Sequence, residues 1–256
     1  MQEEKQIDDI IMEKAPDLSV VADAAILLAA EDDSYAMLRH IGFGASDSSK
    51  LLGLNPFTKL SEMLDEKRNL EPGDPAIKNK ATVRKGKELE DLIMQKASKH
   101  LGIEIFKPKN MYKYKSTRLT VNFDGVSIIK DQLIPIEIKM CSSQGRKYYN
   151  FEKAISEDIT DPKWTTKLSE LNTIKTKDSN CNFPIYYYTQ LQQQMMFLNS
   201  PVGILAVLDD YTWTMRYFCV VADQIMWKEI QIAEIKHRWN LHPEEKVLEL
   251  LKTKEQ

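Results

Sequence analysis

Three ionisable side chains in the middle of the chain have the types and spacing of a metal-dependent hydrolytic site. Asp124 ends one expected strand, and Glu137 and Lys139 lie two residues apart on an alternating strand further along. Because alternate side chains of a strand share a face, Glu137 and Lys139 point the same way and the isoleucines around them point the other way. Folding the intervening hairpin back would bring the Asp124 carboxylate beside that of Glu137.

Such a pair of carboxylates has a definite chemistry. Carboxylate oxygens are the hard ligands that magnesium prefers, so Asp124 and Glu137 suit a divalent cation. Lys139, on the same face, can hold a water beside that cation or stabilise negative charge on a phosphate. These residue types are common, and the stretch taken alone also fits an ordinary solvated strand. The choice between a metal site and a solvated strand therefore depends on the rest of the sequence.

The stretch over residues 118–139, RLTVNFDGVSIIKDQLIPIEIK, is expected to form two or three short strands. Asp124-Gly125 and Lys130-Asp131 are the turn signals within it. A long helix is expected over 82–100, with Glu90 at the edge of its apolar face. A second helix over 185–198, IYYYTQLQQQMMFL, places Gln190 and Gln194 on one face.

Weaker patterns surround these elements. We expect residues 1–33 to be helical and residues 158–182 to form a surface excursion. Strands are expected over 103–106, 111–115, 204–210 and 212–221, and helices over 60–68 and 223–237. This order predicts an α/β fold with a central mixed β-sheet flanked by helices. The expected division is an N-terminal extension over 1–33, a main domain over 34–222 and a C-terminal helical region over 223–256.

The stretch over residues 39–54, RHIGFGASDSSKLLGL, is a candidate anion site. Gly42 and Gly44 precede Ser46-Asp47, which are good N-cap residues for a following helix. Free N–H groups at a helix start favour an anion, and Arg39 with the hydroxyls of this stretch (Ser46, Ser48 and Ser49) would add donors. The alternative is a well-capped helix without a ligand.

Composition sets the remaining bounds. The chain has 256 residues, 43% of them hydrophobic, which is enough for a sizeable core. No apolar run approaches the ~20 residues of a membrane span, and the polar N-terminus does not read as a signal peptide. Three separated cysteines indicate reduced thiols in a cytosolic protein. The net charge of −3 is unfavourable for nucleic-acid binding, but lysine and arginine cluster over 78–87 and 107–118.

Four separated stretches carry a resemblance to a known family. RHIGFGASDSSKLLGL, KGKELEDLIMQKASKHLG, FDG…IEIK and YYYTQLQQQMMF occur in this order between residues 39 and 221. Together they resemble the YqaJ-like viral recombinases and the lambda-type phage exonucleases, a branch of the PD-(D/E)XK nucleases. The resemblance implies a restriction-endonuclease-like core.

The resemblance also implies an activity and its partners. It implies a magnesium-dependent 5′ to 3′ exonuclease, with manganese able to substitute, that acts on ends of linear double-stranded DNA and leaves 3′ overhangs. Relatives are trimeric rings that work with a single-strand annealing protein, so a homo-oligomer and such a partner are expected. A phage or prophage protein in the cytoplasm of a bacterial host is implied, with no membrane association.

The resemblance assigns roles residue by residue. Asp124, Glu137 and the main-chain carbonyl of Ile138 match the metal ligands, and Lys139 matches the lysine that positions or activates water. Glu90 and Gln190 match further residues of the catalytic cleft. Arg39 and Ser46 match residues of the pocket that binds the 5′-phosphate. Arg146 or Lys147 is the expected second basic residue of that pocket.

Two other functions remain open. A site-specific or structure-specific endonuclease on the same core would also cut closed circular DNA. A non-catalytic recombination protein would have the same fold and bind DNA ends without cutting them. The complete set of Asp124, Glu137 and Lys139 argues against that alternative. A plain α/β interaction module would leave the ordered motifs unexplained.

Overall fold

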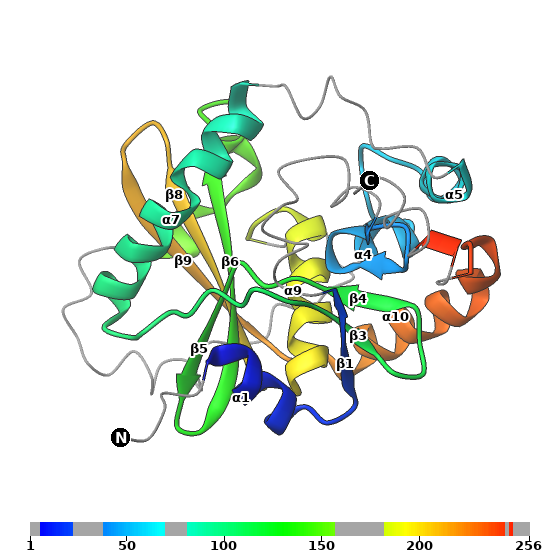
Figure 1. Cartoon of the computed structure of the whole chain (residues 1–256). Helices are drawn as coiled ribbons and strands as arrows, with labels where there is room; N and C mark the ends of the chain where they lie inside the picture. Colours follow the sequence, from blue (N-terminus) through cyan, green and yellow to red (C-terminus); the bar gives the residue numbers. More distant parts are fainter. Residues whose placement is uncertain (1–5, 23–37, 70–80, 157–181, 244–245, 248–256) are drawn as a thin grey trace, which may run out of the picture.

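A computed structural model of the whole chain describes residues 6–22, 38–69, 81–156, 182–243 and 246–247. Its elements form two mixed β-sheets with helices between and around them (Figure 1). The α/β prediction is confirmed, with two sheets in place of the single central one. The expected excursion over 158–182 lies almost wholly outside the described residues.

The first sheet has four strands in the order β1-β3-β4-β2. Strands β1 and β3 pair antiparallel, as do β3 and β4, whereas the two-residue strand β2 runs parallel to β4. The strand bounds are β1 Leu18–Ala22, β2 Phe43–Gly44, β3 Met111–Tyr114 and β4 Leu119–Val121.

The second sheet has five strands in the order β5-β6-β8-β9-β7 and carries the predicted catalytic stretch. Strand β6 is inside the sheet, antiparallel to β5 and parallel to β8. Lys130 and Asp131 both have positive φ in the β5–β6 turn, as a two-residue hairpin loop requires. The bounds are β5 Gly125–Ile129, β6 Gln132–Cys141, β7 Ile155–Ser156, β8 Val202–Asp209 and β9 Thr214–Val221.

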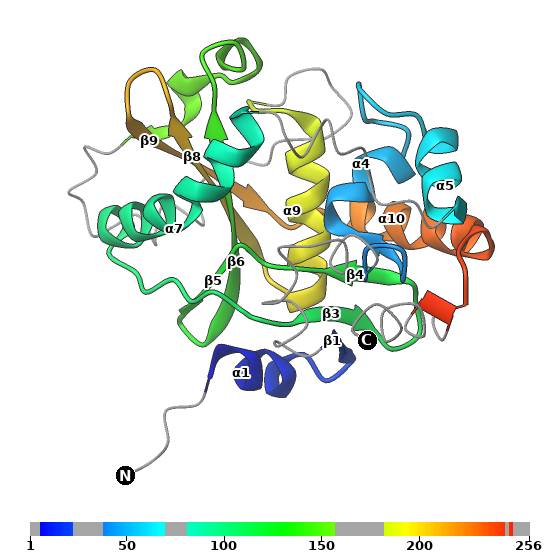
Figure 2. The same ribbon diagram turned by 45° about the horizontal axis from the view of Figure 1, so that its top comes forward.

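Two long helices sandwich this sheet (Figures 1 and 2). Helix α7 (Ala81–Leu101) packs Ile93 and Ala97 on one face, against Ile136 and Ile138 of β6. Helix α9 (Ile185–Leu198) covers the other face and is buried along most of its length, as expected for a helix between two layers. It ends at Asn199, whose left-handed conformation forms the C-cap. Both helices were predicted within a residue or two.

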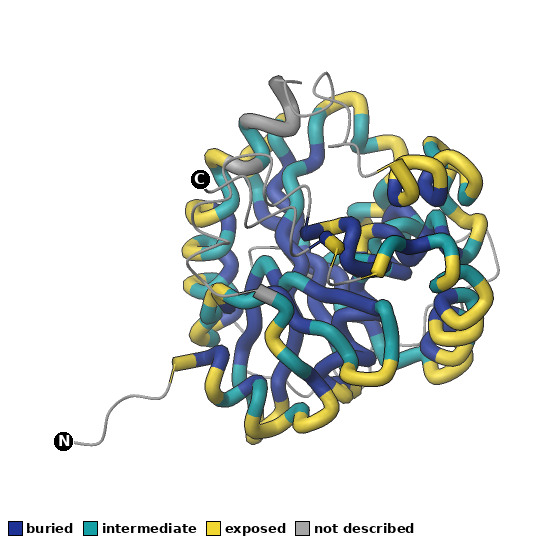
Figure 3. Tube along the Cα trace, turned by 45° about the vertical axis from the view of Figure 1, so that its right-hand side comes forward, coloured by how far each residue is buried: buried dark blue, intermediate teal, exposed yellow. Residues whose placement is uncertain are grey.

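Shorter helices complete the structure. Helices α4 (Ser48–Leu51), α5 (Leu60–Asn69) and α10 (Gln224–His237) lie on the side of α9 away from the second sheet, and α1 (Ile7–Lys14) lies beside β1 (Figures 1 and 2). Buried segments run through the strands and α9, with exposed residues on the outer helices (Figure 3). Within the described chain, no helix has the length and apolar character needed to cross a membrane.

Three local predictions were wrong. Residues 18–22 form strand β1 and not helix, because β-branched residues here pair with the distant strand β3. Residues 103–106 contribute a single bridge, from Phe106 to Val126, and no strand. Asp124-Gly125 is not a hairpin turn, since β4 and β5 belong to different sheets. A side chain at Gly125 would instead meet Ile105 at 2.6 Å, so close packing requires the glycine.

Candidate active site

Strand alternation in β6 places the predicted catalytic side chains toward α9. Ile136 and Ile138 pack under α7, so Glu137 and Lys139 face the opposite way. Gly125 pairs with Ile136 in the β5–β6 hairpin, which brings the preceding Asp124 beside Glu137. The predicted convergence of Asp124, Glu137 and Lys139 is therefore present, and the hairpin register produces it.

The Lys139 ammonium lies at the centre of this group. Its Nζ is 3.1 Å from Asp124 Oδ2, 2.9 Å from the Ile138 carbonyl oxygen and in direct contact with Glu137 Oε1. The Ile138 N–H also donates to Asp124 Oδ2, at 3.0 Å. One cation thus contacts all three groups that were predicted to bind metal.

Two glutamines of α9 hold the Glu137 carboxylate, which is completely buried. Gln190 Nε2 donates to Glu137 Oε1 at 2.5 Å, and Gln194 Nε2 donates to Oε2 at 2.6 Å. The two residues are one helical turn apart, so one face of α9 reaches both oxygens. Carboxylate orientation is consequently fixed by the helix as well as by the strand.

Burial and opposing charges set the protonation of the group. Burial and the neighbouring Asp124 carboxylate raise the pKa of Glu137 to about 7, against the opposite effects of Lys139 and Gln194. Burial disfavours the charged form of Lys139, but Asp124 and Glu137 outweigh it and keep the pKa of Lys139 above its ordinary range. Lys139 is therefore an ammonium at neutral pH.

The donor set is compatible with a hard divalent cation. It comprises carboxylate oxygens of Asp124 and Glu137 and the carbonyl oxygen of Ile138, which are the ligand types of magnesium. Asp124 is 25% exposed, so the group is reachable from solvent, and it already accommodates a positive charge at Lys139. Across the described residues, no group of three or more His, Cys, Asp and Glu residues could hold a metal. A metal here would therefore rely on the carbonyl and on solvent as well.

A cavity of about 110 Å³ adjoins the Asp124 carboxylate. Arg39 and Ser46 line it together with Asp124 and Gln190. Arg39 and Ser46 are exposed, and Arg39 Nη2 donates to Ser46 Oγ at 3.2 Å. The predicted anion-binding pair and Asp124 of the predicted metal group therefore line one cavity, although they come from distant parts of the sequence.

A buried ion pair supports the loop that carries Arg39. Lys67 of α5 donates to the carbonyl oxygens of Arg39 and Gly42 at 2.7 and 2.8 Å, and lies 3.0 Å from Asp47 Oδ2. Burial raises the pKa of Asp47, but Lys67, Lys50 and Arg39 outweigh this effect and hold it well below its usual range. Nothing in the sequence of α5, a highly charged helix, distinguished Lys67 from its neighbours.

The anion site differs from the sequence expectation in two respects. Helix α4 is only four residues long, and Asp47 accepts from the Gly44 N–H at 3.2 Å in place of capping that helix. Ser48 and Ser49 are buried: Ser48 Oγ lies 2.6 Å from Gln193 Oε1, and Ser49 Oγ accepts from Asn55. Their hydroxyls are part of the interior, which leaves Ser46 as the accessible one.

The remaining predicted residues have other contacts. Glu90 of α7 forms an ion pair with Lys107 at 3.0 Å. Arg146, in the short helix η2 (Arg146–Tyr148), pairs with the buried Asp209 at 3.2 Å, and Lys147 lies over the Tyr148 ring. None of the three lines the cavity of Arg39 and Ser46.

The sequence matches the YqaJ-like viral recombinase domain over residues 34–199. This match spans more than half of the chain and contains the cavity and both halves of the candidate site. The chain belongs to the YqaJ-like viral recombinase family. The family resemblance predicted from the four ordered motifs is confirmed. No curated protein sequence matches the chain.

Solved structures agree with this family in fold. The alkaline exonuclease LHK-Exo from Laribacter hongkongensis is 17% identical, with a TM-score of 0.53 over 87% of this chain and 97% of that one. Its complex with dAMP gives 16% identity and a TM-score of 0.54, with the same coverage. A phage-related exonuclease from Haemophilus somnus 129PT is 12% identical, with a TM-score of 0.53 over 84% of this chain and 99% of that one. Family and fold together support the prediction of a DNA exonuclease.

Proposed function

We propose that this protein is a magnesium-dependent exonuclease that degrades one strand of linear double-stranded DNA from its 5′ end and leaves 3′ overhangs. The observation that carries the proposal is the contact of the Lys139 ammonium with Asp124, Glu137 and the Ile138 carbonyl, beside a cavity that Asp124 lines. Membership of the YqaJ-like family supports a DNA substrate.

In this proposal Asp124, Glu137 and the Ile138 carbonyl hold the cation. When bound, magnesium supplies positive charge to the scissile phosphate and acidifies water. Asp124 and Glu137 orient toward that site because Ile138 N–H fixes the first and two α9 glutamines fix the second. Manganese has the same oxygen preference and would substitute.

Lys139 is proposed to act on the attacking water or on the phosphate. Once its ammonium is freed from the carboxylates, its N–H groups can donate to the attacking water or to a phosphate oxygen. Fixed donors aimed at developing negative charge are worth far more in a partly buried site than in water. Gln190, which lines the cavity and touches Glu137, keeps the carboxylate in place while the substrate binds.

The 5′ to 3′ direction of degradation would be set at the Arg39 end of the cavity. A terminal phosphate carries more negative charge than an internal diester, and a guanidinium with a hydroxyl beside it favours the terminal group. The Arg39 side chain is 47% exposed, although its guanidinium also lies 3.8 Å from Asp47 Oδ1, and Ser46 is exposed beside it, so a DNA end can reach both. A 5′-phosphate held there would set the adjoining diester against Asp124.

The family resemblance extends the proposal to the assembly and its setting. It adds a ring of three subunits, an annealing protein that receives the 3′ overhang, and action in a bacterial host. The ring predicts that the native mass is a multiple of three subunits, which analytical ultracentrifugation measures.

Digestion of end-labelled DNA tests the proposal. Linear duplexes labelled at either end, with a 5′-phosphate or a 5′-hydroxyl, are incubated with magnesium or with EDTA beside a closed-circular control. We expect magnesium-dependent loss of the 5′ label, faster from the phosphate, with the closed circle intact. Cutting of the circle would indicate an endonuclease instead. Binding of ends without any digestion would indicate a non-catalytic recombination protein.

A further inference from the structure

Three aromatic rings, here called the aromatic row, connect the protein surface with Lys139: Phe57, Tyr186 and Tyr187. The Phe57 ring lies edge-on to the Tyr186 ring, with 5.7 Å between their centres, and the Tyr186 and Tyr187 ring centres are 4.4 Å apart. The Lys139 ammonium lies 5.6 Å from the centre of the Tyr187 ring, within the range of a cation–π contact. The row therefore ends at the ammonium that contacts the proposed metal ligands.

Phe57 forms the outer end of the row and is 69% exposed. It lies in the loop between α4 and α5, and the side chain of Asn55 fixes that loop. Asn55 Oδ1 accepts from the N–H groups of Phe57 and Thr58 at 2.9 and 3.0 Å. Asn55 Nδ2 donates to Oγ of the buried Ser49 at 2.9 Å. The backbone that carries the Phe57 ring is thus anchored to the interior, which holds the ring at the surface.

The row lies close to the cavity that Arg39 and Asp124 line. Tyr186 is four residues before Gln190 on α9, so the two side chains are neighbours on one face of the helix. Gln190 lines the cavity and contacts Glu137. The base and the phosphate of a nucleotide project from different sides of its sugar. A strand with a phosphate in the cavity can therefore place a base on rings one helical turn away.

Exposed rings beside cations provide the chemistry that binds unpaired nucleobases. Every base has a π-face that stacks on an aromatic ring whatever the sequence, and neighbouring cations attract the phosphate backbone. Lys59 is exposed two residues after Phe57, and Arg39 is also exposed. The Phe57 side chain has no polar atom and cannot distinguish one base edge from another. A ring of this kind suits an enzyme that must accept every base in turn.

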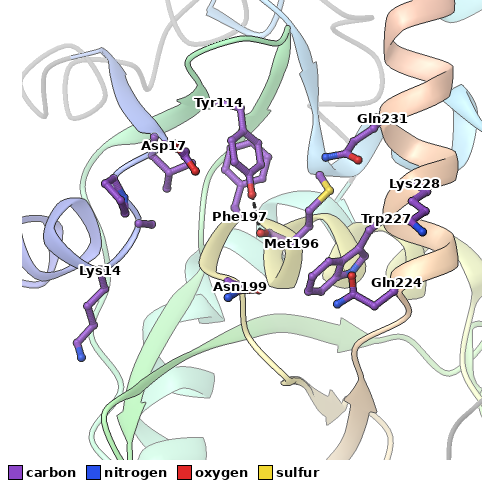
Figure 4. A pocket seen from close by; sticks show the side chains of 13 residues that line it. Lys14, Asp17, Tyr114, Met196, Phe197, Asn199, Gln224, Trp227, Lys228 and Gln231 are labelled. Carbon is purple, nitrogen blue, oxygen red and sulfur yellow. Dashed lines mark hydrogen bonds between the residues drawn. The ribbon is translucent and has the colours of Figure 1, made fainter.

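The last turn of α9 borders a larger cavity, of about 440 Å³, which has rings of a different kind (Figure 4). The Tyr114 hydroxyl donates to the Met196 carbonyl oxygen at 2.7 Å, and the Trp227 indole donates to Gln192 Oε1 at 2.8 Å. These rings are therefore bonded into the interior, and none of Asp124, Glu137 and Lys139 lines this cavity. Only at the first turn of α9, within the described residues, does a printed series of ring contacts reach Lys139.

We propose that the aromatic row is a stacking site for an unpaired nucleobase of the strand held at the cavity, with the Phe57 ring as the face on which the base lies. This inference rests on the proposed function, because it takes a DNA end as the substrate. Tyr186 contacts the Phe57 ring edge-on and leaves most of that ring exposed. A base stacked there holds the strand while its phosphate lies near Lys139, so Phe57 positions the substrate and takes no part in the chemical step.

A cycle of binding measurements tests the stacking site. The DNA is a 5′-phosphorylated duplex whose first four nucleotides are unpaired, and its affinity is measured by fluorescence anisotropy in EDTA, where no cleavage occurs. Phe57→Ala should weaken binding about 5- to 10-fold, the lower part of the range for one stacked base. An abasic site at one of the four positions should weaken wild-type binding equally. It should have no further effect on Phe57→Ala, because both changes remove the same contact.

Two substitutions at the same position separate stacking from apolar contact. Phe57→Trp should bind with wild-type affinity, whereas Phe57→Leu, which is apolar but has no ring, should bind as weakly as Phe57→Ala. The matched control is Ile225→Ala on α10, which also removes an apolar side chain that is 69% exposed. It should change neither the affinity nor the effect of the abasic site. Circular dichroism should be native for every variant, since both positions are mostly exposed.

The inference is overturned if Phe57→Ala or Phe57→Leu binds as tightly as wild type, or if its effect adds to that of every abasic site. Digestion with magnesium is measured separately on wild type. Digestion without the coupling between Phe57 and a base would refute the stacking site and keep the exonuclease. Coupling without digestion would refute the exonuclease and keep the stacking site. Absence of binding to DNA ends would refute both.

Discussion

Replacing Lys139 with methionine tests whether its ammonium stands where a metal ion binds. In the structure this ammonium is the cation shared by Asp124 and by the fully buried Glu137. Removing one partner of a buried ion pair costs about 3 to 5 kcal/mol, because the other charge stays buried without compensation. Lys139 and Asp124 are 23% and 25% exposed, so we take the lower end, about 3 kcal/mol.

The expected result is a stability defect that magnesium repairs. For a chain of this size, about 3 kcal/mol corresponds to a fall in melting temperature of about 6 to 12 °C. That fall should appear in EDTA. Saturating magnesium should raise the melting temperature of Lys139→Met more than that of wild type, because in wild type the ammonium must first leave the same oxygens.

Differential scanning calorimetry in EDTA and in magnesium provides the measurement, and calorimetric titration gives the magnesium affinity of both proteins. Lys99→Met, at an exposed site on α7, is the control and should match wild type in both conditions. If Lys139→Met and wild type have the same melting temperature in EDTA, or if magnesium raises the melting temperature of both proteins equally, the ammonium and the metal do not share a site.

Four further predictions concern cleavage, end recognition, binding and pH. Glu137→Ala should lower the rate of magnesium-dependent cleavage at least about 100-fold with native circular dichroism, since a ligand is lost; equal turnover would mean that the wrong carboxylate was chosen. Arg39→Ala should shrink the ratio of initial rates on 5′-phosphate and 5′-hydroxyl ends without changing magnesium affinity. Duplex binding should weaken by about 10³ or more between about 50 and 200 mM salt, and a flat salt dependence would exclude a basic binding surface. Because the folded-state pKa of Asp47 is lowered, its stabilising effect is present above its ordinary pKa of 3.8 and is lost only below it. The difference in the free energy of unfolding between wild type and Asp47→Asn, measured by urea denaturation, should therefore be constant from pH 7 to 5 and narrow in stronger acid.

The parts of the site that were predictable depend on local spacing. Strand alternation fixes the face of Glu137 and Lys139, and a two-residue turn at Lys130-Asp131 fixes the register that brings Asp124 beside them. The helical repeat places Gln190 and Gln194 one turn apart, so their shared face was also visible in the sequence. None of these inferences requires knowledge of how distant segments meet.

The parts that were missed depend on distant segments. Lys67 supports the Arg39 loop only because α5 packs beside it, 25 residues or more away in sequence. Strand β1 forms because β3 supplies its ladder partners, which outweighs the local preference read from the sequence. Asp124-Gly125 has the sequence of a turn, but the close approach of Gly125 to Ile105 is the better explanation of why this residue is a glycine. Such roles are set by tertiary packing and leave no periodic signal.

Helix α9 shows how a buried element can be held in one register. An apolar helix between two layers could rotate or slide at little cost, whereas each buried amide that loses its partners costs about 1 to 3 kcal/mol. Gln193 donates to the Phe43 and Thr120 carbonyls of the first sheet, and Gln192 accepts from the Trp227 indole of α10. Gln194, the next residue along, donates to Glu137 in the second sheet. Three consecutive side chains thus fix α9 from three directions, so a shift by one residue would break all of these bonds together. The same helix contacts the proposed metal group through Glu137 and the loop of the proposed end-binding residues through Ser48, which brings Asp124 and Arg39 to one cavity.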